Sequence, residues 1–222
     1  MASEKSTLRI SIIYKVIMAI TGVVLVGFLV AHLLGNLLFF SGPLAINQYA
    51  EKLRDYLPVL WLLRVILILS ACLHVYAGIK LSLLNKKAKP RTYAVKKSVK
   101  ANLMSRTMLL SGCIVLFFLI FHLAHLTFKW THKELFSSLV EYDVYSMLSL
   151  SFQSPLMTAF YTLSVMLLGG HLLHGVKSSF QTLGLNHGKF NKGIRLFTYG
   201  LSLFLFLGFI SIPLSIFFRG VK

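Results

Sequence analysis

The sequence has few of the residues that soluble proteins place on their surfaces. Only 13% of its 222 residues are charged, six are acidic and two are cysteines, whereas soluble globular chains carry about 25% charged residues. The hydrophobic residues, 56% of the total, gather in long uncharged runs. These runs exclude a soluble α/β enzyme, a β-barrel with short alternating segments and a disordered chain. Both cysteines lie inside such runs, which excludes a disulfide framework and a cysteine-rich metal site.

Charged residues separate five segments that are long enough to cross a membrane, since a transmembrane helix needs about 20 apolar residues. We therefore predict an all-α, polytopic membrane protein that forms one domain over residues 1–222, with a four-helix bundle and one peripheral helix. The predicted helices lie near residues 12–39, 58–84, 104–129, 155–181 and 195–218. The first run is too long for a cleaved signal peptide, and we expect it to be retained.

Basic and acidic residues are distributed unequally over the connecting segments. The net charge is +17, and the basic residues concentrate near the N-terminus and in residues 85–103 and 182–194. The positive-inside rule places these three segments in the cytoplasm and the C-terminus outside. In a membrane protein such charge reflects topology and attraction to anionic lipid, so we expect no nucleic-acid partner. A docking surface for a cytoplasmic protein is a second interpretation.

Histidine is the unusual residue inside the predicted helices, where ionisable side chains are costly and usually functional. Six of the eight histidines lie there: His32, His74, His122, His125, His171 and His174. Two patterns repeat around them. Residues 21–33 and 111–123 share [ST]-G-x9-H-L, and residues 74–80 and 171–177 share H-x3-G-[IV]-K. The odd-numbered helices thus share one pattern and the even-numbered helices the other.

The spacing from the flanking charges predicts two levels of histidine. His32 and His122 lie 17 and 16 residues beyond the charge that precedes them, near the outer side, and we call them the outer pair. His74 and His171 each lie six residues before a lysine, near the inner side, and we call them the inner pair. At 1.5 Å per residue the two levels differ by roughly 16 Å. Two level pairs of imidazoles in a helix bundle suit two bis-histidine haems, which carry electrons and leave no open iron position.

Two further histidines and four glycines complete the predicted site. His125 and His174 each follow a proposed ligand by three residues on nearly the same helical face, so they are alternative ligands. The repeat favours His122 and His171. Glycines near the ligands would let a flat macrocycle approach the backbone, and close helix packing is the other explanation. These glycines are Gly22, Gly78, Gly112 and Gly175.

Together these features resemble the di-haem cytochrome b subunit of bacterial succinate dehydrogenases and fumarate reductases, in the five-helix, single-anchor type. The resemblance covers nearly the whole chain. It rests on the five spans, on the Ala-His-Leu of residues 31–33, on the H-x3-G and Gly-x9-His patterns, and above all on residues 171–184, HLLHGVKSSFQTLG. It implies that the outer pair binds one haem b and the inner pair a second.

The resemblance also implies partners. A flavoprotein with covalent FAD and an iron–sulfur subunit would sit on the cytoplasmic face of a bacterial inner membrane, and succinate would be oxidised in the flavoprotein. Electrons would pass through the iron–sulfur clusters, the inner haem and the outer haem to a quinone, commonly menaquinone. This chain would then be a membrane anchor, an electron-transfer subunit and part of a quinone site, without catalytic residues for succinate.

Several polar residues are candidates for the quinone and for the haem propionates. Quinone reduction consumes protons, so titratable side chains at the outer level are useful. The quinone candidates are Asn47, Tyr49, Glu51 and Asp55. Arg64 lies inside an apolar run and is the candidate for an outer propionate. The candidates for the inner propionates are Lys15, Lys80, Arg106 and Lys177. A solvated loop, and snorkelling of basic side chains to lipid, are the simpler explanations.

Three other functions compete with this interpretation. A di-haem cytochrome b of a hydrogenase or formate dehydrogenase would use the same chemistry with another partner. A di-iron or zinc membrane metalloenzyme would use the closely spaced histidines, but such sites gather ligands at one depth and include carboxylates. The predicted helices contain no Asp or Glu. A histidine-lined transporter would need broken helices and a midplane site.

Overall fold

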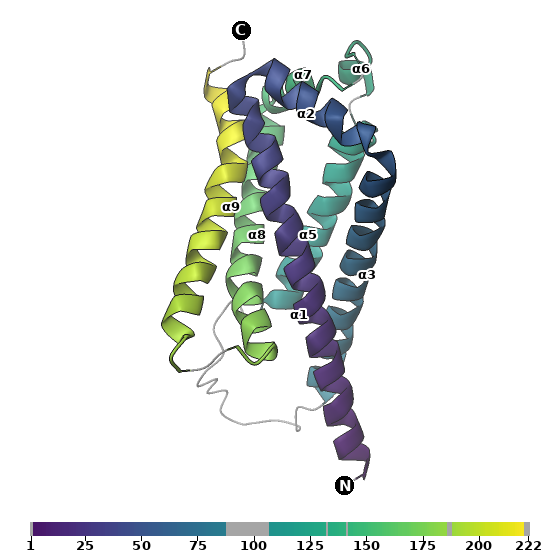
Figure 1. Ribbon diagram of the computed structural model, residues 1–222, viewed down its shortest axis with the longest axis vertical. Helices are drawn as coiled ribbons and strands as arrows, with labels where there is room; N and C mark the ends of the chain where they lie inside the picture. The colour runs from purple at the N-terminus through teal and green to yellow at the C-terminus, as the bar shows by residue number, and fades with distance from the viewer. Residues whose placement is uncertain (1, 88–106, 132, 141, 186–187, 220–222) are drawn as a thin grey trace.

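The computed structural model describes residues 2–87, 107–131, 133–140, 142–185 and 188–219. Over these ranges the chain is helical and contains no strand. Five helices are long and apolar enough to cross a membrane, as predicted. They are α1 (Ala2–Leu37), α3 (Leu57–Lys87), α5 (Met108–His122), α8 (Pro155–Thr182) and α9 (Asn191–Arg219). All five run along the long axis of the molecule, and α1 begins at the end opposite to that where α9 finishes (Figure 1). The all-α, multi-pass class is therefore confirmed.

The observed helix limits differ from the predicted limits mainly at helix ends that carry charged residues. Helix α8 begins at Pro155 as predicted, with Ser154 as its N-cap. Helix α1 already begins at Ala2, ahead of the predicted residue 12, and α9 begins at Asn191, ahead of residue 195. Charged residues limit the part of a helix that can lie in hydrocarbon, but they do not end the helix itself. The predicted start of the third helix, residues 104–106, lies outside the described residues.

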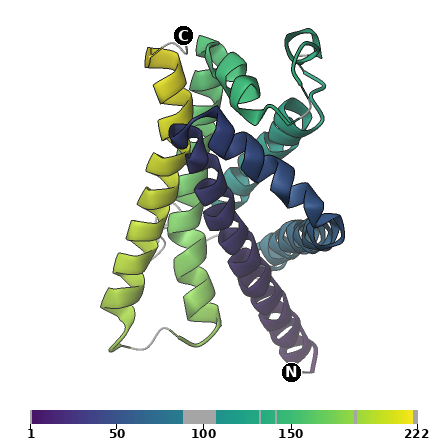
Figure 2. The same cartoon turned by 45° about the horizontal axis from the view of Figure 1, so that its top comes forward.

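Short helices that were not among the predicted helices cover one end of the bundle. They are α2 (Pro43–Asp55), α6 (Lys133–Phe136) and α7 (Val144–Phe152), with a 3-10 turn at Leu38–Ser41 before α2. Gly42 makes the sharp entry to α2 with φ of 97°, a value that favours glycine, and Pro43 suits the first helical position. Helix α2 lies across the end of the bundle (Figure 2).

One polar contact joins α2 to the start of α7. The Asn47 amide nitrogen donates to Asp143 over 3.0 Å, and its carbonyl oxygen accepts from the backbone N–H of Tyr145 over 3.0 Å. Asp143 in turn caps α7 by accepting from the N–H of Ser146. Burial alone would raise the pKa of the Asp143 carboxyl, but these hydrogen bonds and the charge of Lys129 hold that pKa below its ordinary value.

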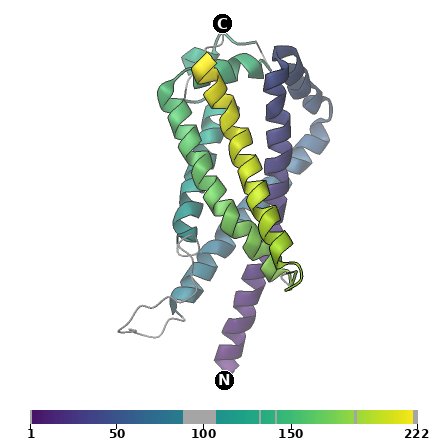
Figure 3. The same cartoon turned by 90° about the vertical axis from the view of Figure 1, so that its left-hand side faces the viewer.

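Helix α9 carries no histidine and lies beside α8, outside the four helices that bear the histidines (Figure 3). It nevertheless packs closely. Leu33 of α1 is fully buried with Leu205 of α9 and with Leu172 and Val176 of α8. A Cβ atom at Gly208 of α9 would lie 2.5 Å from Cδ2 of Leu33, so only glycine allows this approach of the two helices.

Helices α3 and α5 turn most of their apolar side chains outward. Within their most apolar windows only 6% of the residues are buried, compared with 28% in α8 and α9. Leu62, Leu69, Phe117 and Ile120 are each more than half exposed. A soluble protein rarely exposes so large an apolar surface, whereas lipid solvates it well. The packing thus agrees with a chain that crosses a membrane several times.

Candidate functional site

The structure brings the inner histidines together from two helices that are distant in sequence. His74 lies on α3 and His171 on α8, with ring centroids 6.5 Å apart and ring planes inclined by 65°. The outer histidines also meet. His32 near the end of α1 and His122 at the end of α5 have ring centroids 6.0 Å apart and planes inclined by 88°.

Both separations fit one metal ion held between two imidazoles. A bond from a first-row metal to imidazole nitrogen is about 2.0–2.1 Å, and the ring centroid lies about 1.1 Å further out, so two such rings on opposite sides of one ion have centroids about 6.3 Å apart. The observed 6.0 and 6.5 Å lie on either side of this value. A haem iron takes four ligands from its porphyrin, so the protein needs to contribute only two. Among the described residues no group of three or more His, Cys, Asp and Glu side chains could hold an ion.

Each inner histidine has a hydroxyl group behind it. Oγ1 of Thr21 on α1 lies 3.1 Å from Nδ1 of His74, and Oγ of Ser111 on α5 lies 3.1 Å from Nδ1 of His171. Thr21 and Ser111 are the first residues of the repeated [ST]-G-x9-H pattern. The two repeats therefore place equivalent hydroxyls on equivalent imidazoles.

The same hydroxyls are also bonded to backbone carbonyl groups. Thr21 donates to the carbonyl of Ile17 over 2.7 Å, and Ser111 donates to that of Met108 over 3.0 Å. A hydroxyl has one proton, and a carbonyl can only accept, so the hydroxyl must accept from the imidazole. This arrangement favours the tautomer in which Nδ1 carries the proton and Nε2 keeps its lone pair. A neutral imidazole in this state is ready to bind a metal.

The four predicted glycines have two different environments. A Cβ atom at Gly22 would lie 3.3 Å from Cε1 of His74, and one at Gly112 would lie 3.6 Å from Cε1 of His171. These two glycines therefore contact the imidazoles themselves. At Gly78 a Cβ would meet only Met18 Sδ, 3.9 Å away, and at Gly175 it would meet nothing within 4 Å. A flat group could lie against the backbone at Gly78 and Gly175.

The outer pair has aromatic neighbours in place of hydroxyl groups. His32 stacks on Phe28, with centroids 5.2 Å apart, and lies 5.9 Å from the ring of Phe209 on α9. The His122 ring lies 5.9 Å from that of Tyr161 on α8. Nδ1 of His122 is buried and has no hydrogen-bond partner among the described residues. The two pairs thus differ in polarity.

The alternative ligands occupy other positions. His125 is fully buried, and its Nδ1 lies 2.9 Å from the hydroxyl of Tyr161. It lies in a single π-helical turn, Leu123–Thr127, that begins directly after His122. The wider turn alters the face on which His125 lies, and such turns are frequent at functional sites. Tyr161 was not predicted as a site residue, although a tyrosine inside an uncharged run is a signal of a buried hydroxyl that needs a partner.

His174 lies one turn beyond His171 on α8 and is half-buried. The ring that faces His74 is that of His171. The geometry therefore supports His122 and His171 as the members of the two pairs.

A comparison of the chain with known protein families, curated proteins and solved structures finds no significant match. The site is thus defined by its own geometry.

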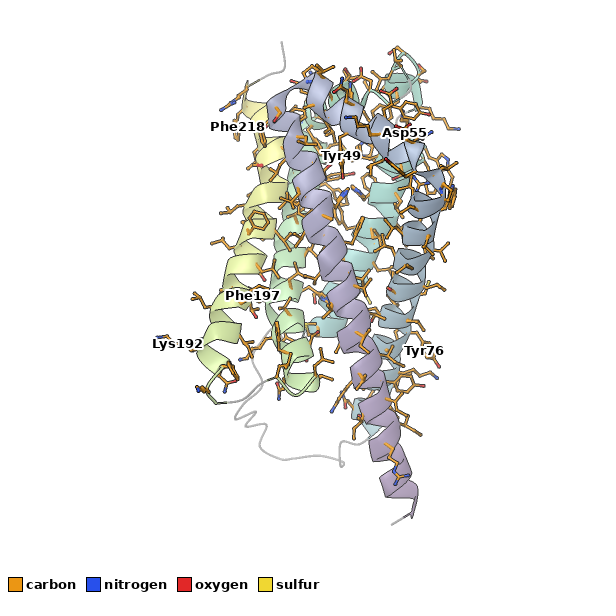
Figure 4. The ribbon with its side chains drawn as sticks, in the orientation of Figure 1. Tyr49, Asp55, Tyr76, Lys192, Phe197 and Phe218 are labelled. Carbon is orange, nitrogen blue, oxygen red and sulfur yellow. The ribbon has the colours of Figure 1, made fainter. Side chains whose placement is uncertain are left out.

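The quinone candidates all lie on α2. Asn47 is bonded to Asp143 and to the backbone of Tyr145, so it serves as a structural link. The ring of Tyr49 lies against α1, where a Cβ at Gly35 would come within 2.7 Å of Cε1. Glu51 and Asp55 are exposed, and Figure 4 shows Asp55 and Tyr49 at the same end of the bundle. His32 of the outer pair lies on the last turns of α1, which ends at Leu37 shortly before α2 begins.

The propionate candidates lie on the exterior. The described members Arg64, Lys15, Lys80 and Lys177 are all exposed, and Arg106 lies outside the described residues. The Arg64 guanidinium lies 5.1 Å from the Trp61 ring centroid, and the Lys80 ammonium lies 5.5 Å from that of Tyr76. Tyr76 points away from the bundle (Figure 4). These contacts are typical of basic side chains that snorkel along a helix toward an interface, so a propionate role stays a prediction.

Proposed function

We propose that this protein is the di-haem cytochrome b subunit that anchors a succinate dehydrogenase or fumarate reductase in the bacterial cytoplasmic membrane. One observation carries the di-haem part of the proposal. Four membrane-crossing helices supply two imidazole pairs with centroid separations of 6.0 and 6.5 Å, as two axial histidines on one iron require. The succinate part rests on the resemblance of residues 171–184 to this family.

Each group of residues has a defined task under this proposal. His32 and His122 would hold the outer haem, and His74 and His171 the inner haem. When bound, the two haems supply a path for single electrons across the apolar bundle, between reduced iron–sulfur clusters of a partner subunit and a quinone such as menaquinone. The aromatic and aliphatic side chains around the pairs exclude water, and the apolar exterior of α3 and α5 holds the chain in lipid.

The ends of the bundle would serve the partners. The basic segments near the N-terminus and around residues 182–194 would receive the iron–sulfur subunit and, with it, the flavoprotein. At the opposite end, Glu51 and Asp55 on α2 would exchange protons with a quinone near the outer pair.

A haem count on the purified chain tests the proposal. We expect two haems b per polypeptide in the pyridine haemochrome assay, and strong Soret and α bands in the dithionite-reduced minus oxidised spectrum. Absence of haem from a folded preparation made with haem supplied would overturn it. In native membranes, succinate should reduce both haems, and a flavin-bearing partner should copurify. If hydrogen or formate reduced the two haems and succinate did not, the chain would still be a di-haem cytochrome b. Its partner would then be a hydrogenase or a formate dehydrogenase.

A further inference from the structure

We infer that Thr21 and Ser111 are positioning residues that set the reduction potential of the inner haem by accepting a hydrogen bond from each of its two ligands. This inference rests on the proposed function. The sequence pattern associated these residues only with histidines on their own helices. The structure instead places their hydroxyls 3.1 Å from Nδ1 of His74 and His171, on neighbouring helices.

The two contacts are built alike. Each hydroxyl donates its own proton to a carbonyl of the preceding turn, three or four residues earlier. Each is then left with lone pairs that accept from Nδ1–H of the histidine. The glycine that follows each hydroxyl residue lets the imidazole lie against the helix, since a Cβ there would come within 3.3 to 3.6 Å of the ring. Hydroxyl and glycine together thus form a seat for the ring on α1 and again on α5.

The seat has an electronic consequence. An imidazole that donates a hydrogen bond from one nitrogen is a stronger donor through the other, and a more basic ligand stabilises the oxidised metal. The two hydroxyls therefore lower the potential of the inner haem. Among the described residues the two hydroxyls are bonded to His74 and His171 and to neither outer histidine, so their removal should leave the potential of the outer haem unchanged.

Substitution of each hydroxyl tests the inference in the full-length, haem-loaded chain. Thr21→Val and Ser111→Ala should each raise the midpoint potential of one b component in a redox titration, and it should be the component that His74→Ala eliminates. Thr21→Ser and Ser111→Thr keep the hydroxyl and should keep the wild-type potential. The two shifts should have the same sign, because each variant removes the hydroxyl that accepts from one ligand of the inner pair.

Two residues on α9 provide matched controls. Thr198 is buried and donates to the carbonyl four residues earlier, as Thr21 does, and Ser211 donates to the carbonyl three residues earlier, as Ser111 does. Neither hydroxyl is bonded to a histidine among the described residues. Thr198→Val and Ser211→Ala should leave both potentials unchanged, although they remove the same kind of hydroxyl from a helix.

The outcomes separate the inference from the proposed function. A wild-type chain without haem would overturn both. Two haems with unchanged potentials in Thr21→Val and Ser111→Ala would overturn the inference and leave the cytochrome proposal standing. Loss of the inner haem from one of these variants, with retention in the Ser or Thr variant and in the α9 control, would support the positioning role. The two hydroxyls act on one haem. If one of the two variants does not accumulate, the potential measured in the other variant still tests the inference.

Discussion

Ser111 and His171 are 60 residues apart in the sequence, and the serine hydroxyl lies 3.1 Å from the imidazole Nδ1. Thr21 and His74 have the same relationship across 53 residues. Each hydroxyl begins a [ST]-G-x9-H pattern whose last residue is an outer histidine. One pattern thus contributes to both pairs: its first residue bonds to an inner histidine on the next membrane-crossing helix, and its last residue belongs to the outer pair.

The pairing predicts which histidine variants share a phenotype. His32→Ala and His122→Ala should remove the same b component, because their rings face one another across 6.0 Å. His74→Ala and His171→Ala should remove the other component. The double variant of one pair should lose no more haem than either single variant, measured by pyridine haemochrome and by reduced-minus-oxidised spectra.

The neighbouring histidines are the control for this experiment. His125→Gln and His174→Ala should retain two haems, since neither ring faces the partner histidine in the structure. If His171→Ala kept two haems and His174→Ala kept one, the inner ligand would have to be reassigned. The same comparison applies to His122 and His125.

Tyr161→Phe should lower stability without changing the haem content. The tyrosine hydroxyl is the partner of Nδ1 of the fully buried His125, and loss of a partner for a buried polar group costs about 1–3 kcal/mol. A lower unfolding temperature in detergent, with two haems retained, is the expected result. Tyr199→Phe on α9 removes a hydroxyl from an exposed ring and should be neutral. Equal unfolding temperatures for the two variants would show that the His125–Tyr161 bond has no stabilising role.

Gly208→Ala should destabilise the packing of α9 on α1. The added Cβ would lie 2.5 Å from Cδ2 of Leu33, which is fully buried and has little room to move. Overpacking of this kind costs about 1–3 kcal/mol. Gly200→Ala on the same helix is the matched control, because its Cβ would meet nothing within 4 Å. The thermal unfolding of the two variants should therefore differ, and a cavity made by Leu33→Ala should restore part of the loss in Gly208→Ala.

Asp143→Ala should weaken the attachment of α7 to α2 in a pH-dependent manner. The pKa of the Asp143 carboxyl is lowered below its ordinary 3.8, because hydrogen bonds from Ser146 and Asn47 outweigh the effect of burial. A lowered folded-state pKa gives stability that is present above the unfolded-state pKa and is lost as pH falls through the folded-state value. Asp143→Ala should cost about 1 kcal/mol at neutral pH, as is typical of an N-cap.

The difference in stability between wild type and Asp143→Ala should shrink as the pH falls below 3.8, because the wild-type carboxylate is then neutralised by protonation. Unfolding temperatures at several pH values measure it. Asp55→Ala is the charge-matched control, because Asp55 is exposed at the last position of α2. A constant difference across the acidic range would mean that the carboxylate charge is not what holds α7.

The five membrane-crossing helices could be predicted because the bilayer imposes a length and excludes charge. The same rule cannot predict the short helices, which do not cross the bilayer. Helix α2 has 13 residues, half of them polar or charged, and only Ile46 is buried. Its formation depends on tertiary contacts, such as those of Ile46 with the apolar cluster around Phe39 and Leu148, which no charge pattern reveals.

The pairing of histidines could be proposed from depth alone, because each helix crosses the membrane only once and depth follows residue number. The hydroxyl groups that bond to the inner pair could not be predicted in this way. Whether Thr21 faces its own helix neighbours or His74 depends on the rotation of α1 against α3. Asn47 was a quinone candidate by position, but its partner Asp143 lies 96 residues away, and only the fold brings the two together.

The bonds from Thr21 to His74 and from Ser111 to His171 join consecutive membrane helices, α1 with α3 and α5 with α8. Both imidazole pairs, in contrast, join the first two of these helices to the last two. Each helical hairpin can thus order its own inner histidine during synthesis, before the hairpins dock. Under the proposed function, a haem bound between the paired rings would join the docked hairpins at two heights, and its binding free energy would add to that of folding. Leu33 of α1 also packs against Leu172 and Val176 of α8, so the hairpins can dock without haem, and haem supply would set how firmly they stay docked.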